Sequence, residues 1–153
     1  MDNESDPMSI WKKYISAWNL HDIERVLAIV SDSFEYNESP MTMTKSIIGK
    51  EQFSRYLETV FNNLPDLHIE ITSLDAGNNA AWSESVMRGT YQKKNLFFPE
   101  IKRKMDVKVA CSFKVKDGLL AQENLYWDRA SLLRQLGFLP SLLGVITQPV
   151  WRP

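Results

Sequence analysis

The sequence predicts an α+β fold in which a curved antiparallel sheet wraps around N-terminal helices. Three observations lead to this prediction. Apolar residues recur at helical spacing in the N-terminal part, they alternate with polar residues in most of the remainder, and one further helical stretch follows the last strand. Helices and strands therefore occur in blocks, which is the order of an α+β domain rather than of an alternating parallel sheet. We expect such a sheet to form a cone around an apolar pocket.

The length and composition of the chain predict one domain over residues 1–153. The chain is 44% hydrophobic and 24% charged, which suits a sizeable core. Its net charge of -1 favours neither nucleic acid nor an anionic membrane as a partner. Cys111 is the one cysteine, so no intrachain disulfide is expected, and we predict a cytoplasmic location. The acidic N-terminus and the lack of a long apolar run predict neither an export signal nor a membrane span.

Two helices are predicted at the N-terminus. Asp6-Pro7 is a favourable helix start, because proline needs no amide partner in the first turn. A strongly aromatic stripe at helical spacing follows, and it includes Tyr14 and Trp18. We interpret these two residues as core residues that can also contact a ligand. A second short helix, residues 23–30, should pack against the first as a hairpin.

In the middle of the chain, the pattern predicts a strand, then a helix, and then two further strands. A short strand contains Phe34 to Asn37 and ends near Pro40, and a helix carries Phe53 and its apolar neighbours at i, i+3 and i+4. The alternating LHIEITSL segment predicts a strand, which turns at residues 77–79 into a long strand from Ala80 to Tyr91. Residues 92–105 are interpreted as a loop or ragged strand.

The clearest element is a hairpin near the C-terminus. Residues 107–115 alternate strictly, and Asp117-Gly118 suits a tight turn with positive φ before a returning strand, residues 119–127. Asp128 is interpreted as the cap of a final helix, which ends at Gly137. The tail, residues 138–153, is apolar but broken by glycine and prolines, so it should cover the pocket or form a subunit contact.

These pieces resemble the SnoaL-like polyketide cyclase family of the nuclear-transport-factor-2-like superfamily. The segments that carry the resemblance are YISAWNLHDIERVLAIVSDSFEYNESP, FNNLPDLHIEITSLDAGNNAAWSE, VMRGTY and FKVKDGLLAQENLYWDRASLLRQLG. The last is the most specific. The resemblance implies a conical α+β barrel, frequently a homodimer, with a deep pocket and no cofactor.

The resemblance also implies site positions. The family's acid/base aspartate, three residues before the aspartate that begins the last helix, falls at Leu125, and a histidine common on the preceding strand falls at Cys111. The asparagine at the end of the first strand is kept as Asn37. Asn37 could therefore donate a hydrogen bond to an oxyanion, and Leu125 and Cys111 are expected to line the pocket.

Two carboxylates are candidates for proton transfer. Glu123 shares a strand face with Leu125, and Glu84 shares one with Arg88. A glutamate in an apolar pocket has a raised pKa and can act as a general acid or base near neutral pH. The structural alternatives are that Glu84 pairs with Arg88 or faces solvent, and that Glu123 points outward.

Three functions remain open from the sequence. The first is a cofactor-independent enzyme that acts on a hydrophobic small molecule by cyclase, isomerase or epoxide hydrolase chemistry, with Glu123 as acid/base and Asn37 as oxyanion donor. The second is a non-catalytic small-molecule-binding domain, which Leu125 and Cys111 favour. The third is a dimerisation module. His21 and His68 are the only histidines, so no metal site is expected.

Overall fold

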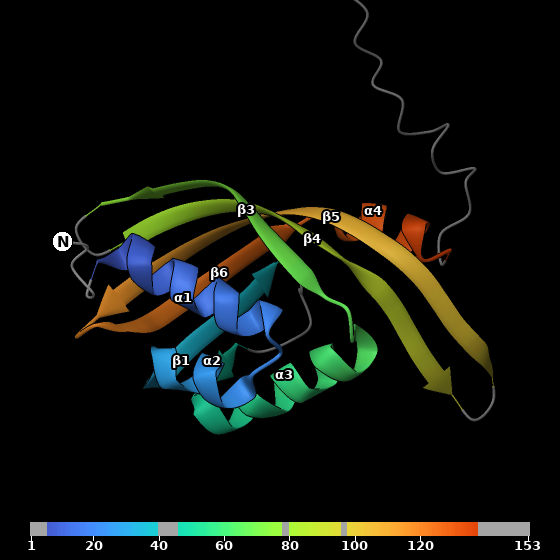
Figure 1. The fold of residues 1–153 in the computed structure, drawn as a ribbon, viewed down its shortest axis with the longest axis horizontal. Coiled ribbons are helices and arrows are strands. Elements are labelled where there is room, and N and C mark those ends of the chain that lie inside the picture. The colour runs from blue at the N-terminus through green and yellow to red at the C-terminus, as the bar shows by residue number, and fades with distance from the viewer. Residues whose placement is uncertain (1–5, 40–45, 78–79, 96–97, 138–153) are drawn as a thin grey trace, which may run out of the picture.

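A six-stranded sheet curves around three helices in the computed structural model, which describes residues 6–39, 46–77, 80–95 and 98–137 (Figure 1). The elements, in chain order, are α1 (Pro7–Asn19), α2 (Ile23–Ile29), β1 (Val30–Ser39), β2 (Ile47–Ile48), α3 (Lys50–Asn63), β3 (His68–Ala76), β4 (Ala80–Asn95), β5 (Phe98–Lys116), β6 (Leu119–Trp127) and α4 (Arg129–Gln135). This α+β architecture confirms the predicted fold class.

Three of the helices begin at aspartates whose carboxylates accept a hydrogen bond from a free backbone amide. Asp6 caps α1 through the Ser9 amide at 3.2 Å, and Asp22 caps α2. Asp128 caps α4 through the Ser131 amide at 3.1 Å, as predicted, and hydrogen bonds from Ser131 lower the pKa of the Asp128 carboxyl. Asp128 therefore stabilises a helix start.

The sheet order is β2-β1-β6-β5-β4-β3, and one pairing corrects the prediction of an antiparallel sheet. β1 runs parallel to β6, whereas the other neighbouring strands are antiparallel. A parallel pair needs a long connection between its strands, and residues 40–118 connect β1 to β6. β1 begins earlier than predicted, at Val30, and it ends at Ser39, near the predicted end, so that Glu38 belongs to the sheet.

The longest hairpin shows how residues 92–105 are folded. Of the two alternatives, a loop or a ragged strand, the strand is observed, because β4 continues to Asn95 and β5 begins at Phe98, with a register shift between Lys93 and Asn95. The two strands pair along this length, for example Gln92 with Lys102. Each strand satisfies the other's backbone groups, so a polar composition does not prevent strand formation. Figure 1 shows the joined ends of β4 and β5 reaching beyond α3.

The turn between β5 and β6 is confirmed, with positive φ at Asp117 (53°) and Gly118 (76°). β3 and β4 are antiparallel, as expected, but residues 78 and 79 of the predicted turn lie outside the described residues. The tail, residues 138–153, also lies outside them, so its proposed role as pocket cover or subunit contact stays a prediction. Among the described helices, none is long and apolar enough to cross a membrane.

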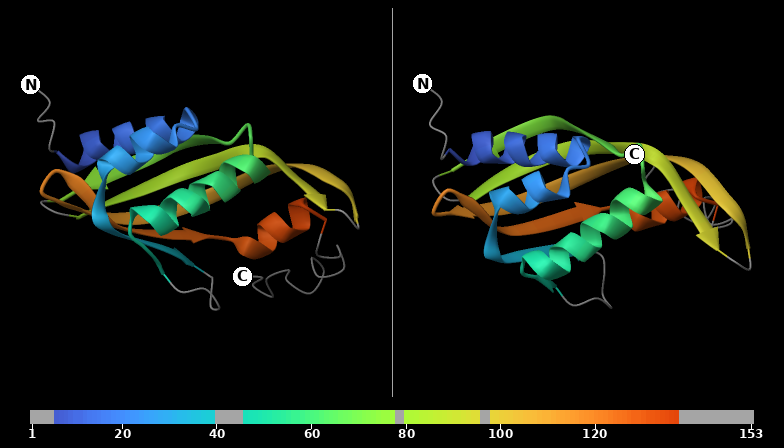
Figure 2. Two further views of the ribbon diagram at one scale, coloured as in Figure 1. Left: turned by 90° about the horizontal axis from the view of Figure 1, so that it is seen from below. Right: turned by 60° about the horizontal axis from the view of Figure 1, so that its bottom comes forward.

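The core lies between the concave face of the sheet and α1, α2 and α3, which lie on that side (Figure 2). Trp11 of α1 stacks on Phe113 of β5 with ring centroids 4.2 Å apart, while Phe53 of α3 packs edge-on against Phe34 of β1. These buried aromatic contacts hold the helices at the sheet. A cavity lies next to these contacts, and Trp11 is part of its lining.

Candidate functional site

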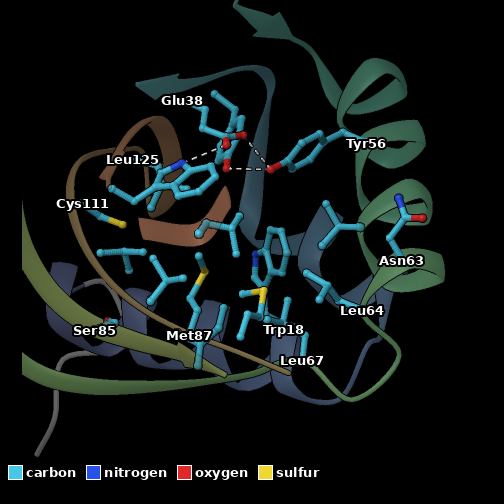
Figure 3. Close-up of a pocket in the computed structure, with 18 of the residues that line it drawn as sticks. Trp18, Glu38, Tyr56, Asn63, Leu64, Leu67, Ser85, Met87, Cys111 and Leu125 are labelled. Carbon is cyan, nitrogen blue, oxygen red and sulfur yellow. Dashed lines mark hydrogen bonds between the residues drawn. The ribbon is translucent and has the colours of Figure 1, made fainter. Parts of the chain in front are cut away.

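The cavity has a volume of about 380 Å³ and lies between the sheet and helices α1, α3 and α4. Its lining is mostly apolar, and Figure 3 shows side chains from both helices and strands converging on it. The polar and aromatic groups that line it are Trp11, Tyr14, Trp18, Tyr36, Glu38, Tyr56, Thr59, Asn63, Ser85, Tyr91, Cys111, Glu123, Trp127 and Arg129. A concave apolar site with a few polar groups has the form of a small-molecule pocket.

Glu123 of β6 is the most deeply buried carboxyl group of this pocket, with 5% of its surface exposed. Strand alternation places its side chain on the concave face together with Leu125 and Trp127. Tyr14 of α1 reaches across the core, and its hydroxyl donates a hydrogen bond to Glu123 Oε2 at 2.7 Å. Helix and sheet together therefore position the carboxyl group.

The protonation of Glu123 is set mainly by burial. Burial disfavours the carboxylate and raises the pKa of Glu123 to about 7, although hydrogen bonds from Tyr14 and Cys111 oppose this shift. The nearby charge of Glu38 raises the pKa further. At neutral pH Glu123 is thus close to its midpoint, which is where a side chain serves equally well as proton donor and acceptor.

A second polar group in the pocket surrounds Glu38 of β1. The Trp127 indole N–H donates to Glu38 Oε1 at 2.9 Å, and the Tyr56 hydroxyl donates to Oε2 at 3.1 Å. Figure 3 shows Glu38 and Tyr56 directed toward one another from β1 and α3. These two donors, from α3 and from the end of β6, orient the Glu38 carboxylate at the cavity.

Tyr36 extends this group by one further hydrogen bond. Its hydroxyl oxygen lies 3.0 Å from that of Tyr56. A tyrosine hydroxyl has one proton, and since Tyr56 donates its proton to Glu38, Tyr36 must donate to Tyr56. Burial raises the pKa of both tyrosines well above their ordinary value, so both stay protonated donors.

Five of the predicted site residues are brought together at the cavity: Tyr14, Trp18, Cys111, Glu123 and Leu125. The alternative that Glu123 points outward at a strand edge is wrong. Cys111 lies opposite Leu125 in the β5–β6 pair, and burial raises the pKa of its thiol. The neutral thiol is a weak nucleophile, so Cys111 is a lining residue of the cavity and a poor candidate for a nucleophile.

Asn37 and Glu84 are not at the cavity, which corrects two predictions of pocket contact. The Asn37 amide lies on the other face of the sheet and donates to Glu35 Oε1 at 3.1 Å and to Asn124 Oδ1 at 3.0 Å. Glu84 is exposed, whereas its neighbours in β4, Ser83 and Ser85, are buried. Both corrections follow from strand alternation, because Tyr36 and Glu38 occupy the inner face of β1.

The group around Glu38 was missed from the sequence. Tyr36, Asn37 and Glu38 follow one another, so alternation alone indicates that Asn37 and Glu38 face opposite ways. That pattern does not say which face is concave. Tyr56 was read only as one apolar position of a helix, although a hydroxyl in a buried stripe needs a hydrogen-bond partner.

No group of three or more His, Cys, Asp or Glu side chains within the described residues is placed to hold a metal ion. His21 takes part in the α1–α2 turn instead. Its Nε2 lies 3.0 Å from the Leu67 carbonyl oxygen, and its ring stacks on Phe61. His68 is exposed.

The model of the SnoaL-like polyketide cyclase family matches residues 9–136. Among solved structures, TsrD from Streptomyces laurentii is similar, with a TM-score of 0.73 and 22% identity over 91% of this chain and 99% of that one. A hypothetical protein with a ketosteroid isomerase-like fold from Catenulispora acidiphila has a TM-score of 0.71 and 18% identity over 97% and 99% of the two chains.

An epoxide hydrolase from M. tuberculosis, of the LEH-like type, has a TM-score of 0.67 and 16% identity over 94% of this chain and 95% of that one. No curated protein matches the sequence. Identities this low show the fold alone, whereas the family match covers nearly all of the described chain. The chain therefore belongs to the SnoaL-like polyketide cyclase family.

Proposed function

We propose that the protein is an acid/base enzyme that works without a cofactor and moves a proton on a hydrophobic, carbonyl- or epoxide-bearing small molecule. One observation carries the proposal. The Glu123 carboxyl faces an apolar cavity, is bonded to Tyr14 at 2.7 Å, and has a pKa of about 7. Such a pKa suits proton transfer in both directions at neutral pH.

The chemistry follows from the surroundings of Glu123. As carboxylate it takes a proton from a carbon next to the substrate's carbonyl group, and as carboxylic acid it returns that proton to the product or to a leaving oxygen. The Tyr14 hydroxyl stabilises the carboxylate each time it forms. An apolar wall excludes water, so the charge that develops in the substrate interacts strongly with these groups.

Glu38 is the second functional carboxylate of the proposal. It shares the cavity with Glu123, and like charges in one site favour a state in which one of the two groups keeps a proton. The pocket can thus offer an acid and a base together. That combination suits ring closure or epoxide opening, and the family description and the similar epoxide hydrolase support this class of reaction.

Elimination of 5-nitrobenzisoxazole tests the proposal without the natural substrate. A carboxylate base in an apolar pocket removes the ring C–H proton, the N–O bond breaks, and a coloured cyanophenolate is released. We expect kcat/KM to rise with pH with an apparent pKa of about 7. Glu123→Gln should lower kcat/KM by roughly a hundredfold or more, the usual effect of losing an acid/base group.

Glu84→Gln is the matched control, because Glu84 is an exposed glutamate of the same sheet and should leave the rate unchanged. Undiminished elimination by Glu123→Gln, or a profile without an inflection near pH 7, would contradict the assignment of Glu123.

A binding domain without catalysis is the second candidate. The cavity carries Leu125 and Cys111 at the positions where the family resemblance implies an aspartate and a histidine, and neither side chain transfers protons here. A pocket that binds apolar ligands equally well in wild type and in a Glu123→Gln, Glu38→Gln double variant, with no elimination by wild type, would favour this candidate.

A further inference from the structure

The Glu38 carboxylate at the cavity has acceptor positions that the protein does not fill. It accepts one hydrogen bond at each oxygen, from the Trp127 indole N–H at 2.9 Å and from the Tyr56 hydroxyl at 3.1 Å (Figure 3). An ionised carboxylate offers about four acceptor positions, so these two donors leave some of them open. Glu38 is also only partly buried, although it belongs to the cavity lining. A ligand group can therefore join the two donors.

Both donors are neutral, so they orient the negative charge of Glu38 without compensating it. Within the described residues, no lysine, arginine or histidine forms an ion pair with Glu38 or Glu123. Arg129 is the one basic residue among the described residues of the lining, and it is exposed. The lining thus combines two carboxyl groups with one exposed guanidinium group, and its inner part favours a positive charge.

The charge of Glu38 acts on other groups of the cavity. Burial raises the pKa of Glu123, Tyr36 and Tyr56, and the charge of Glu38 raises each of these pKa values further. Charges interact more strongly in an apolar, half-buried site than in water, because less solvent screens them. A cation beside Glu38 would therefore be attracted, and it would offset the effect of Glu38 on Glu123.

The walls near Glu38 suit a cation that carries alkyl groups. Tyr36, Tyr56 and Trp127 form part of the lining here, with the two tyrosine ring centroids 4.9 Å apart, and most of the remaining lining is apolar. A primary ammonium group loses strong hydrogen bonds to water in such a place. An N-alkylated ammonium group loses fewer, and its methyl or methylene groups contact the apolar walls.

We propose that the substrate of this pocket carries an alkylated ammonium group, which binds beside the Glu38 carboxylate while the apolar part of the molecule fills the cavity. Glu38 is then the residue that determines specificity for charge. The inference rests on the proposed function in taking the cavity as the substrate pocket, and it adds the charge of the substrate. It also links binding to catalysis, because the ammonium group favours the carboxylate form of Glu123, which is the base.

Two probes of the same shape test the charge preference. (2-Naphthylmethyl)trimethylammonium and 2-neopentylnaphthalene differ only in a positively charged nitrogen that replaces a carbon. Equilibrium dialysis measures how tightly the protein binds each probe. Glu38→Gln should weaken binding of the cation roughly tenfold or more, because a charge interaction in a half-buried site is lost. Binding of the neutral probe should change by less than about twofold, which also shows that the variant keeps its pocket.

Glu35→Gln is the matched control for Glu38→Gln. Glu35 belongs to the same strand, but it lies outside the cavity lining and accepts hydrogen bonds from Asn37 and Gln122 on the other face of the sheet. Its replacement removes the same charge from β1 at a place where solvent and salt screen it from the cavity. The Glu35→Gln variant should therefore bind both probes as wild type does.

The titration of Glu123 gives a second readout. A ¹³C-carboxyl NMR titration should show a lower pKa for Glu123 in the complex with the cation than in the complex with the neutral probe, because a nearby positive charge favours the carboxylate. The neutral probe displaces the same water, so it separates the effect of charge from the effect of burial.

The inference is overturned if wild type does not bind the cation, if Glu38→Gln leaves its binding unchanged or weakens both probes equally, or if Glu123 titrates alike in the two complexes. Neither readout needs turnover. If Glu123→Gln leaves elimination undiminished while Glu38→Gln still weakens only the cation, the proposed catalysis is wrong and the charge preference stands for a binding protein.

Discussion

The two faces of the sheet use the same kinds of residues for different purposes. On the concave face Glu123 is 5% exposed, has a raised pKa and contacts Tyr14. On the convex face Glu84 is exposed, while Arg88 pairs with Glu70 and Asp106 in solvent. A carboxylate in water needs no special partner, whereas a buried one changes its protonation. Burial, and not residue type, therefore distinguishes the candidate acid/base.

The same contrast applies to hydrogen bonds across β1 and β6. On the convex face Asn37 bonds Asn124, its direct neighbour in the parallel pair, and thus connects the two strands. On the concave face Trp127 of β6 bonds Glu38 of β1, and this contact faces the cavity. One pair of strands therefore carries a structural contact outside and a candidate functional contact inside.

Packing gives the largest expected difference between the faces. Phe113→Ala removes a side chain that is fully buried against Trp11, so the free energy of unfolding should fall by about 3–5 kcal/mol. Trp82→Ala, on the exposed face, should change it by about 0.5 kcal/mol or less. Urea unfolding monitored by circular dichroism measures both. Equal losses would show that the convex face is also covered.

The pH dependence of the free energy of unfolding gives the second largest expected difference between the two faces. The folded protein holds the Glu123 proton up to about pH 7, whereas the unfolded chain releases it near the ordinary value of 4.5. The native state thus binds more protons between these values, so this group makes the free energy of unfolding fall as pH rises from 4.5 to 7. The expected loss is roughly 3 kcal/mol.

Glu123→Gln removes that titration. Its free energy of unfolding, relative to wild type at the same pH, should therefore increase by about 3 kcal/mol from pH 4.5 to pH 8. Glu84→Gln should show no such trend, because Glu84 is exposed. A constant difference between Glu123→Gln and wild type across this range would mean that Glu123 titrates like a surface glutamate.

Tyr14→Phe tests how the buried hydrogen bond on the concave face affects the pKa of Glu123. The Tyr14 hydrogen bond favours the carboxylate of Glu123, so its removal should raise the pKa of Glu123 above about 7. A ¹³C-carboxyl NMR titration, with Glu123→Gln to assign the signal, measures the shift. Tyr126→Phe, a change to a half-exposed tyrosine outside the cavity lining, should leave the titration unaltered. A downward shift would contradict the donor role of Tyr14.

Asn37→Ala should have the smallest effect. It removes the amide that joins β1 to β6 on the convex face, which should lower the free energy of unfolding by about 1 kcal/mol. The titration of Glu123 and the elimination rate should stay as in wild type, because Asn37 does not line the cavity. A large loss of elimination activity would restore the predicted role of Asn37 as an oxyanion donor.

The sequence pattern alone predicted much of the candidate site. The alternation of residues 119–127 placed Glu123, Leu125 and Trp127 on one face, and the helical spacing of Tyr14 and Trp18 placed both on the buried stripe. Asn37 was assigned to the pocket from the family resemblance and Glu84 from the composition of its strand face, and neither argument determines which face of the strand is concave. For Glu84, the buried neighbours Ser83 and Ser85 are small and polar, so hydropathy indicated the wrong inner face.

Local periodicity by itself determined the helices, the β5–β6 hairpin, the Asp128 cap and the pairing of side chains on common faces, because these depend on residues a few positions apart. Only the tertiary structure decided which faces enclose the cavity and which groups meet there. Tyr14 contacts Glu123 across 109 residues, and Trp127 contacts Glu38 across 89. No local pattern records the parallel β1–β6 pairing, which aligns Tyr36 with Glu123 and places Glu38 in the same cavity.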